Sequence, residues 1–502
     1  MSDKKVTIIG AGLGGLVTGA ILAKEGLQVT VVEKNPKVGG GLQSYQRFGV
    51  TFDTGMHVFG GMYPGGNIRR ICDYLGITGD FEIQNLDATN QADIYVAEEN
   101  RTYSVNMKKE SFVDSFARYF PHQTDNLRQY LAAIDGIMQS LDLFYLRPLG
   151  KSGNRTADDF ITPADEFIAK HIDDRRLRSL LAVVNLLYAG EAGVTPAFLH
   201  SAISTIFLNG ACRVVGGYST FADALVNCIV AHGGKVVVGA PVTQIVTDGC
   251  RVKAVVTGGE QMDSDLVVSA IPPKSMIDML DNKRLVSNSY RKLISEKKDS
   301  LSAFIINIKV KPRSVRYSNR MGFFLRSYDS AWKAYDGGSV EKFMYMTPPA
   351  SCQGEYAETL NIVLPMHWEV VERWENTTVG RRGEDYAAFK AALYEAVMDE
   401  MEKAAPGIRS AVDSVDTATP LTIRDYTGVG HGAMCGERKD SNSILQFMPV
   451  VTRVPNLYLT GQSVFMHGFC GVSLTAIQTC EAILGEGYVI GRINPHPPAP
   501  SP

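Results

Sequence analysis

A glycine-rich turn between two apolar stretches is the feature that most constrains this chain. Residues 6–9 read Val-Thr-Ile-Ile, which is typical of a buried parallel strand, and the pattern G-x-G-x-x-G follows at 10–15. Residues 16–24 have the composition of an apolar helix, and a second apolar strand at 29–32 ends at Glu33. This order of strand, turn, helix, strand and acid predicts a dinucleotide-binding βαβ unit.

Each glycine of the turn has an expected physical role. We expect Gly10 to make the tight turn, Gly12 to let the backbone approach a pyrophosphate, and Gly15 to let helix and strand pack closely. The free N–H groups and partial positive charge of the helix N-terminus suit phosphate. Glu33 is placed to accept hydrogen bonds from ribose hydroxyls. The other candidate nucleotide ligands of this unit are Ala11, Leu13, Gly14 and Lys34.

The 502 residues are too many for one simple core, and their patterns alternate along the chain. Three segments with strand and helix patterns predict one discontinuous α/β domain of the Rossmann type, with a parallel sheet. These segments are 1–69, 216–273 and 451–490. The helix-rich segment 70–215 and the mixed segment 274–450 predict an inserted α+β domain that binds the substrate. The proline-rich residues 491–502 are expected to form a disordered tail.

Charge and cysteine spacing exclude several functional classes. A formal net charge of -3 argues against a nucleic-acid partner. No C-x-x-C pair occurs, so we expect no metal site and no redox dithiol. The apolar run at 180–190 is too short to span a bilayer, and the first strand leaves no room for a signal peptide, which predicts a cytoplasmic protein.

Two further turns follow the nucleotide fingerprint. Gly40, Gly41 and Leu42 lie in a run of glycines after the second strand, which suggests backbone packed against a bulky group. A flexible surface loop is the alternative for this run. Asp53 and Gly55 flank a threonine in a turn that would bring main-chain groups close to a planar ring.

These motifs occur in order along nearly the whole chain, and together they resemble one family of flavoproteins. They lie at 10–15, 33, 39–40, 52–55, 242–256 and 456–462. The sequence is similar to the family that includes phytoene desaturases, carotenoid isomerases and retinol saturases, which is itself related to amine oxidases. The resemblance implies FAD as the cofactor and a Rossmann-like FAD-binding domain of the glutathione-reductase-like kind.

The resemblance also implies where the two ends of FAD lie. The segment at Val242 would hold the adenine through its main chain. A loop that starts at Gly461, with Gln462 next to it, would end at the flavin. The following helix is expected to begin at Val472 and to point its N-terminus at the pyrimidine edge of the ring. Gly471 and Val472 would lie beside the ring, where the helix dipole stabilises the reduced flavin.

Two positions depart from the family pattern. Related desaturases and amine oxidases often have arginine where Gly41 stands, which removes one phosphate or flavin contact. Many relatives have an acid where Gln462 stands, so a neutral amide would meet the ribityl chain. The Thr-Gly-Gln order at 460–462 looks more like the retinol saturases, which favours saturation or isomerisation.

The catalytic side chains are the least determined part of the site. A saturase needs a proton donor beside its hydride donor, and His57 and His467 lie in segments expected near the ring. The alternative is that each histidine bonds the local backbone. Tyr188 and Glu191 would border a substrate channel or be a packed tyrosine and a solvated glutamate. The apolar residues 180–189 would form a buried helix or line a tunnel.

The sequence therefore predicts an FAD-dependent oxidoreductase acting on carbon–carbon double bonds of a large apolar, isoprenoid-like substrate such as a carotenoid or retinoid. No second dinucleotide fingerprint is present, so NAD(P)H would bind only transiently. An amine-oxidase-like enzyme that oxidises C–N bonds, and a non-redox escort protein for prenylated partners, remain as alternatives. Resemblance to lipid-modifying enzymes leaves room for a peripheral membrane-surface contact. The oligomeric state is not indicated.

Overall fold

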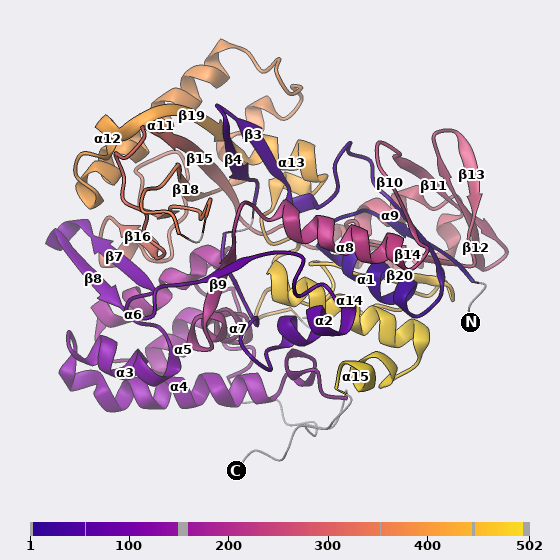
Figure 1. Ribbon diagram of the computed structural model, residues 1–502, viewed down its shortest axis with the longest axis horizontal. Helices are drawn as coiled ribbons and strands as arrows, with labels where there is room; N and C mark the ends of the chain where they lie inside the picture. The colour runs from indigo at the N-terminus through magenta and orange to yellow at the C-terminus, as the bar shows by residue number, and fades with distance from the viewer. Residues whose placement is uncertain (1–3, 56, 149–158, 352, 444–446, 495–502) are drawn as a thin grey trace.

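The computed structural model describes residues 4–55, 57–148, 159–351, 353–443 and 447–494 (Figure 1). Its elements fall into a half built around a parallel sheet and a half built around a larger mixed sheet. The final helix α15 (Tyr488–Ile493) includes Gly491. The tail therefore begins later than residue 491, and residues 495–502 lie outside the described part.

A five-stranded sheet, in the order β10-β2-β1-β14-β20, forms the first half, and every neighbouring pair is parallel. Its strands are β1 (Lys5–Ile9), β2 (Gln28–Val32), β10 (Lys235–Val237), β14 (Leu266–Ser269) and β20 (Leu457–Leu459). They come from three parts of the chain that are far apart in sequence. The strands are largely apolar because both faces of the sheet are covered, one by helices and the other by an antiparallel sheet with two short helices.

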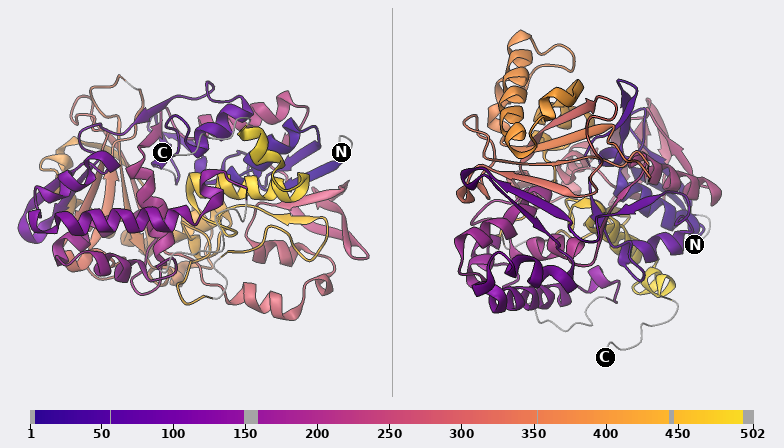
Figure 2. Two further views of the ribbon diagram at one scale, coloured as in Figure 1. Left: turned by 90° about the horizontal axis from the view of Figure 1, so that it is seen from below. Right: turned by 60° about the vertical axis from the view of Figure 1, so that its left-hand side comes forward.

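Helix α1 (Leu13–Lys24) contacts both α8 (Ser219–Ala231) and α14 (Gly468–Leu484). Figures 1 and 2 show the yellow α14 beside the indigo N-terminal elements. Nearly the whole of α1 is buried, because each of its faces packs against another element. A three-stranded antiparallel sheet adjoins this half: β11 (Val242–Asp248), β12 (Arg251–Thr257) and β13 (Glu260–Asp263).

The second half contains a seven-stranded sheet in the order β19-β15-β18-β17-β16-β7-β8. Its strands are β7 (Ala92–Val96), β8 (Arg101–Val105), β15 (Ser302–Val310), β16 (Met321–Leu325), β17 (Lys342–Met346), β18 (Thr359–Met366) and β19 (Val412–Ala418). Only the β16–β7 pair is parallel among the described ladders of this sheet. Side chains of one face share a core with the helical layer, and those of the other pack against α11 (Glu384–Ala404).

Most remaining helices cover the mixed sheet or connect the halves. They are α2 (Asn67–Leu75), α3 (Lys109–Ala117), α4 (Thr124–Gln139), α5 (Ala164–His171), α6 (Arg175–Ala182), α7 (Ala197–Leu208), α9 (Pro273–Met279), α10 (Asn288–Glu296), α12 (Ile408–Ala411) and α13 (Pro420–Thr427). Short strands complete the fold: the hairpin β3 (Ser44–Arg47) and β4 (Val50–Asp53), with β5 (Phe59–Gly60), β6 (Ile83–Asn85) and β9 (Ala211–Val214). The α/β class with a parallel sheet agrees with the sequence.

Two expected boundaries differ from the structure. Helix α14 begins at Gly468 rather than Val472, and the glycine at 471 lies inside it. A side chain at Gly471 would lie 2.6 Å from the Cβ atom of Met466, so this glycine serves close packing and does not mark a loop. The apolar stretch beginning at residue 180 is the end of α6 followed by the 3₁₀ turn Val183–Leu187.

Candidate functional site

A cavity of about 1260 Å³ runs between the two halves of the molecule. Ile9, Val32, Ala270 and Thr460 line it, at or directly after the carboxyl ends of four strands of the parallel sheet. This is the edge at which open α/β sheets bind their ligands. The volume exceeds the range of about 300–1,000 Å³ that is usual for one small-molecule pocket. The cavity therefore has room for a cofactor together with a substrate.

The glycine turn has the geometry that its sequence predicts. Gly10 has a φ of +100°, which makes the tight turn, and a Cβ atom at Gly15 would collide with the carbonyl oxygen of Gly10. The packing role of Gly15 is thus confirmed, and neither Gly15 nor Ala11 lines the cavity. A Cβ atom at Gly12 would meet nothing within 4 Å, so open space lies in front of this backbone. Leu13 and Gly14 begin helix α1 at the cavity wall.

The carboxylate of Glu33 connects the turn to the end of strand β2. One oxygen accepts a hydrogen bond from the backbone N–H of Ala11 at 2.8 Å, and the other accepts from that of Asn35 at 2.9 Å. The side chain is buried, yet Glu33 and the next residue, Lys34, both line the cavity. Carboxylate oxygens have several lone pairs, so these bonds leave acceptor capacity for ribose hydroxyls.

Glycines from three segments come close together beside the glycine turn: those of the turn itself, Gly40 and Gly461. A Cβ atom at Gly40 would lie 3.2 Å from the Cα atom of Gly12, and one at Gly14 would lie 3.1 Å from that of Gly461. The remaining predicted residues that line this cavity are Gly41, Leu42, Gly55, Val242, Gln462, Gly471 and Val472. Backbone can approach a flat ring here because these loops carry few side chains. The residues present therefore fit a bound flavin nucleotide.

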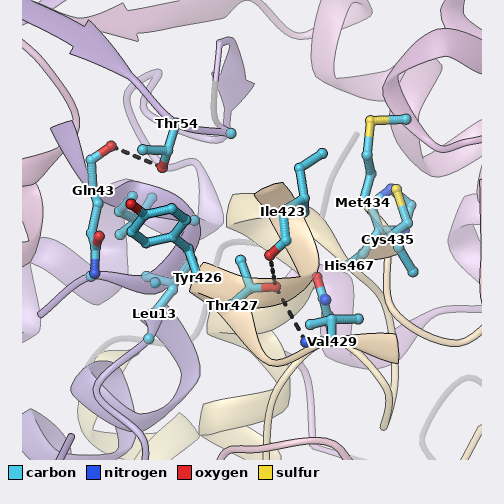
Figure 3. Close-up of a pocket in the computed structure, with 18 of the residues that line it drawn as sticks. Leu13, Gln43, Thr54, Ile423, Tyr426, Thr427, Val429, Met434, Cys435 and His467 are labelled. Atoms are coloured by element: carbon cyan, nitrogen blue, oxygen red, sulfur yellow. Dashed lines mark hydrogen bonds between the residues drawn. The ribbon is translucent and has the colours of Figure 1, made fainter. Parts of the chain in front are cut away.

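Asp53 does not line the cavity, contrary to the expectation that it contacts the cofactor. Its carboxylate accepts hydrogen bonds from the Ser44 hydroxyl at 2.6 Å and from the backbone N–H of Tyr218 at 2.9 Å. Burial raises the pKa of this carboxyl group, while the two hydrogen bonds lower it. Asp53 thus fixes the hairpin β3–β4 to the start of α8. Its neighbour Thr54 reaches the cavity and donates to the carbonyl of Gln43 at 3.0 Å (Figure 3).

His467 lies at the cavity wall as the N-terminal cap residue of α14. Its Nε2–H donates to the carbonyl of Leu187 at 3.3 Å, so the ring does bond backbone, but that of a segment distant in sequence rather than the local backbone expected. Burial lowers the pKa of His467 to about 4, so the ring is neutral at neutral pH. Figure 3 shows His467 on the same side of the cavity as Met434 and Cys435.

His57 also lines the cavity and is buried. Burial lowers the pKa of His57 to about 4, and the guanidinium charge of Arg213 acts in the same direction. A neutral imidazole can donate one hydrogen bond, but it lacks the second proton that the charged imidazolium could release as a general acid. Both predicted histidines therefore face the site in the neutral form.

The other candidates from the insertion are structural. The hydroxyl of Tyr188 is 2.9 Å from Nδ1 of His200, whose Nε2 is 2.6 Å from the hydroxyl of Tyr130. All three side chains are buried, so Tyr188 is a packed tyrosine as the alternative interpretation held. The other candidate of this segment, Glu191, forms an ion pair with Arg438 at 3.5 Å.

An apolar wall completes the cavity, and the sequence did not indicate most of it. Helix α7 contributes four apolar side chains, strands β15, β17 and β18 of the mixed sheet contribute one each, and two come from the 3₁₀ turn after α6. They are Leu199, Ala202, Ile203, Ile206, Ile305, Met344, Val363, Leu186 and Leu187. The stretch at 180–189 is therefore buried core at its start and cavity wall near its end. The detectable signal was the recurrence of apolar residues at helical spacing within 197–208, at 197–199, 202–203 and 206–208.

Within the described residues, the helices are all too short or too polar to cross a bilayer. The same residues contain no group of histidine, cysteine and acidic side chains arranged to hold a metal ion.

Comparison with known proteins places this geometry in context. Residues 13–484 match the model of the flavin containing amine oxidoreductase family. All-trans-retinol 13,14-reductase of Rattus norvegicus is 25% identical, over 95% of this chain and 85% of that protein. Prolycopene isomerase 2 of an Oncidium hybrid cultivar is 24% identical, over 95% and 83%. Cyclohexylamine oxidase from Brevibacterium oxydans has a similar fold, with a TM-score of 0.64 at 15% identity, over 96% of this chain and 98% of that one.

Proposed function

We propose a function from the premise that the chain belongs to the family of flavin-containing amine oxidoreductases. The enzyme is an FAD-dependent oxidoreductase that acts on carbon–carbon double bonds of a large apolar, isoprenoid-like substrate such as a retinoid or carotenoid. One observation carries the proposal: a single cavity joins a glycine-lined nucleotide site to a wall of aliphatic side chains. Two relatives that match over almost the whole chain, a retinol reductase and a prolycopene isomerase, support the substrate class.

FAD would lie along the edge of the parallel sheet. The open backbone at Gly12 and the N-terminus of α1 would bind the pyrophosphate, and Glu33 would bind the ribose. The backbone at Val242 would hold the adenine. Gly461 and Gln462, together with the N-terminus of α14, would hold the flavin end. Bound FAD would supply hydride transfer, which the protein side chains cannot perform.

The protein's own contribution is to position the double bond and to exclude water. The aliphatic side chains of α7 and of strands β15, β17 and β18 would hold an apolar chain without offering competing hydrogen bonds. His57 would be the side chain that donates a hydrogen bond toward the reacting centre, whereas neutral His467, whose Nε2–H already donates to the carbonyl of Leu187, would offer only an acceptor nitrogen. Because both are neutral, saturation would need a proton from outside the imidazoles, whereas isomerisation needs no net proton.

The test is anaerobic photoreduction of the FAD-loaded protein, followed by mixing with retinol and with lycopene isomers. We expect reoxidation of the flavin coupled to loss or shift of the polyene absorbance. No change in either absorbance across retinoids and carotenoids would contradict the substrate class. Turnover of amines with rapid reoxidation by oxygen would support the amine-oxidase alternative, and protein that takes up no FAD would support an escort role.

A further inference from the structure

The wall of the cavity changes from apolar to polar in one step along the mixed sheet. Ile305 on β15 pairs with Val363 on β18 and with Ala418 on β19, and all three line the cavity. Two residues further along the same face of β15, Asn307 pairs with Asp416 on β19, and both line the cavity. The two rows are about 7 Å apart, because residues i and i+2 of a strand share a face.

The polar row is held by its own hydrogen bonds. The hydroxyl of Tyr45 donates to the carboxylate of Asp416 at 2.9 Å and accepts from the amide of Asn307 at 2.8 Å. Arg47 forms an ion pair with the other oxygen of Asp416, also at 2.9 Å. Each oxygen of the Asp416 carboxylate thereby has one partner, and Arg47 neutralises its charge.

Lys390 on α11 brings a further cation to this end of the cavity. The charged groups that act on it are one carboxylate, Asp416, and two guanidinium groups, Arg47 and Arg382. Arg382 has its own partner in Asp425, which does not line the cavity. Burial lowers the pKa of Lys390, and the two arginines act in the same direction while Asp416 opposes them.

No carboxylate lies within ion-pair distance of the Lys390 ammonium among the residues that the structure describes; the Tyr386 ring, 5.7 Å away, is its aromatic neighbour. Glu384, the other acid that lines this region, is on the exposed first turn of α11. Arg47 pairs with Asp416, and Arg382 and Arg424 share Asp425, so Lys390 is the cation at this end that has no acidic partner among the described residues. An anionic ligand group would match this unpaired ammonium.

We propose that Lys390 and Arg47 form a subsite for a single anionic head group, so that the substrate is a long apolar chain ending in a carboxylate. The chain would lie over the row of Ile305, Val363 and Ala418, and the head would lie over the row of Asn307 and Asp416. This inference rests on the proposed function, because it specifies the far end of the same substrate. A carboxylate is favoured over a phosphate because Lys390 offers a single ammonium without an acidic partner at this end of the described cavity.

The test measures binding to the FAD-loaded protein by titrating the flavin absorbance with palmitate, methyl palmitate and hexadecyl phosphate. We expect palmitate to bind at least tenfold more tightly than its ester. The variant Lys390→Met should lose this preference, and Lys390→Arg should keep it. Lys403→Met is the matched control, because Lys403 lies on the same helix and does not line the cavity. It should behave like the unaltered protein.

Equal binding of acid and ester by the unaltered protein would overturn the subsite. A preference that persists in Lys390→Met would overturn the assignment to Lys390, and tighter binding of hexadecyl phosphate than of palmitate would overturn the single-charge match. These probes contain no polyene, so their results are independent of the proposed reaction. A Lys390-dependent preference for palmitate without any polyene turnover would preserve the subsite and reject the proposed function.

Discussion

The backbone N–H of Ala11 donates a hydrogen bond of 2.8 Å to the carboxylate of Glu33, which ties the glycine turn to the end of strand β2. The acid therefore has a structural role before any nucleotide binds. A hydrogen bond to a buried charge contributes more than one between neutral groups, about 1.5–3 kcal/mol. The same carboxylate faces the cavity, so turn geometry and ribose recognition depend on one side chain.

Replacing Glu33 with glutamine should weaken FAD binding by about tenfold to a hundredfold, in line with about 1.5–3 kcal/mol for a charge-assisted bond. The amide keeps the size of the side chain but removes the charge and can accept through only one atom. Fluorescence titration of apoprotein with FAD measures the effect. Glu260→Gln, at an exposed position of β13, is the control. Equal FAD affinity in both variants would contradict the role of Glu33.

Alanine at Gly12 should reduce FAD affinity, whereas alanine at Gly15 should reduce folding stability. Gly12 has an ordinary φ of -73° and open space before it, so Gly12→Ala should fold with a stability within about 0.5 kcal/mol of the original. It should nevertheless lose about 1–3 kcal/mol of FAD affinity, because the new methyl group meets the pyrophosphate. Gly15→Ala should lose about 1–3 kcal/mol of folding stability, because its Cβ atom would collide with Gly10.

Urea unfolding of the apoprotein and FAD titration separate these two effects. If Gly12→Ala unfolded as easily as Gly15→Ala, the space at Gly12 would not be reserved for a ligand. If Gly15→Ala kept full stability, the close packing of α1 on the sheet would be wrong.

The nucleotide site was predictable because its requirements are local. The turn around Gly10 and Gly15 needs a fixed spacing within one βαβ unit, and that spacing can be read directly. Asp53 shows where this logic fails. Its Asp-Thr-Gly turn does bring Thr54 and Gly55 to the cavity, but the carboxylate itself turns away to Ser44 and the N-terminus of α8. A sequence pattern does not reveal which way a side chain of a turn points.

The substrate wall was less predictable because it is assembled from distant strands. Ile305 meets Val363 only through the register of β15 and β18, and neither residue has a local signature. Lys390 likewise has no local signature, because the charged groups that act on it come from separate parts of the chain. The neutral state of His467 also depends on burial by distant residues, and burial of a particular side chain cannot be read from its neighbours in sequence.

A larger side chain in the apolar wall should weaken substrate binding while leaving the affinity for FAD unchanged. Ala202 on α7 lines the cavity and is buried, so Ala202→Trp would occupy space meant for the substrate. We expect the dissociation constant for retinol to rise at least tenfold, about 1.4 kcal/mol, with FAD affinity unchanged. Ala132→Trp, at an exposed position of α4 outside the cavity, is the control. Loss of FAD from Ala202→Trp, or unchanged retinol binding, would contradict this placement.

The lowered pKa of His467 predicts a specific pH dependence of stability. The pKa is about 4 in the folded protein and 6.5 for an ordinary histidine. Above pH 6.5 both states are neutral at this ring, and the group has no effect. As the pH falls from 6.5 towards 4, the unfolded chain binds a proton that the folded protein does not, so folding stability decreases, by about 3 kcal/mol in total for this group.

His467→Gln should therefore reduce the loss of stability between pH 7 and pH 5, measured by urea unfolding. His232→Gln, at an exposed position directly after α8, is the control. An identical slope in His467→Gln and in the unaltered protein would mean that burial does not lower the pKa of this ring, and a charged imidazole at the start of α14 would then be available as a proton donor below about pH 6.5.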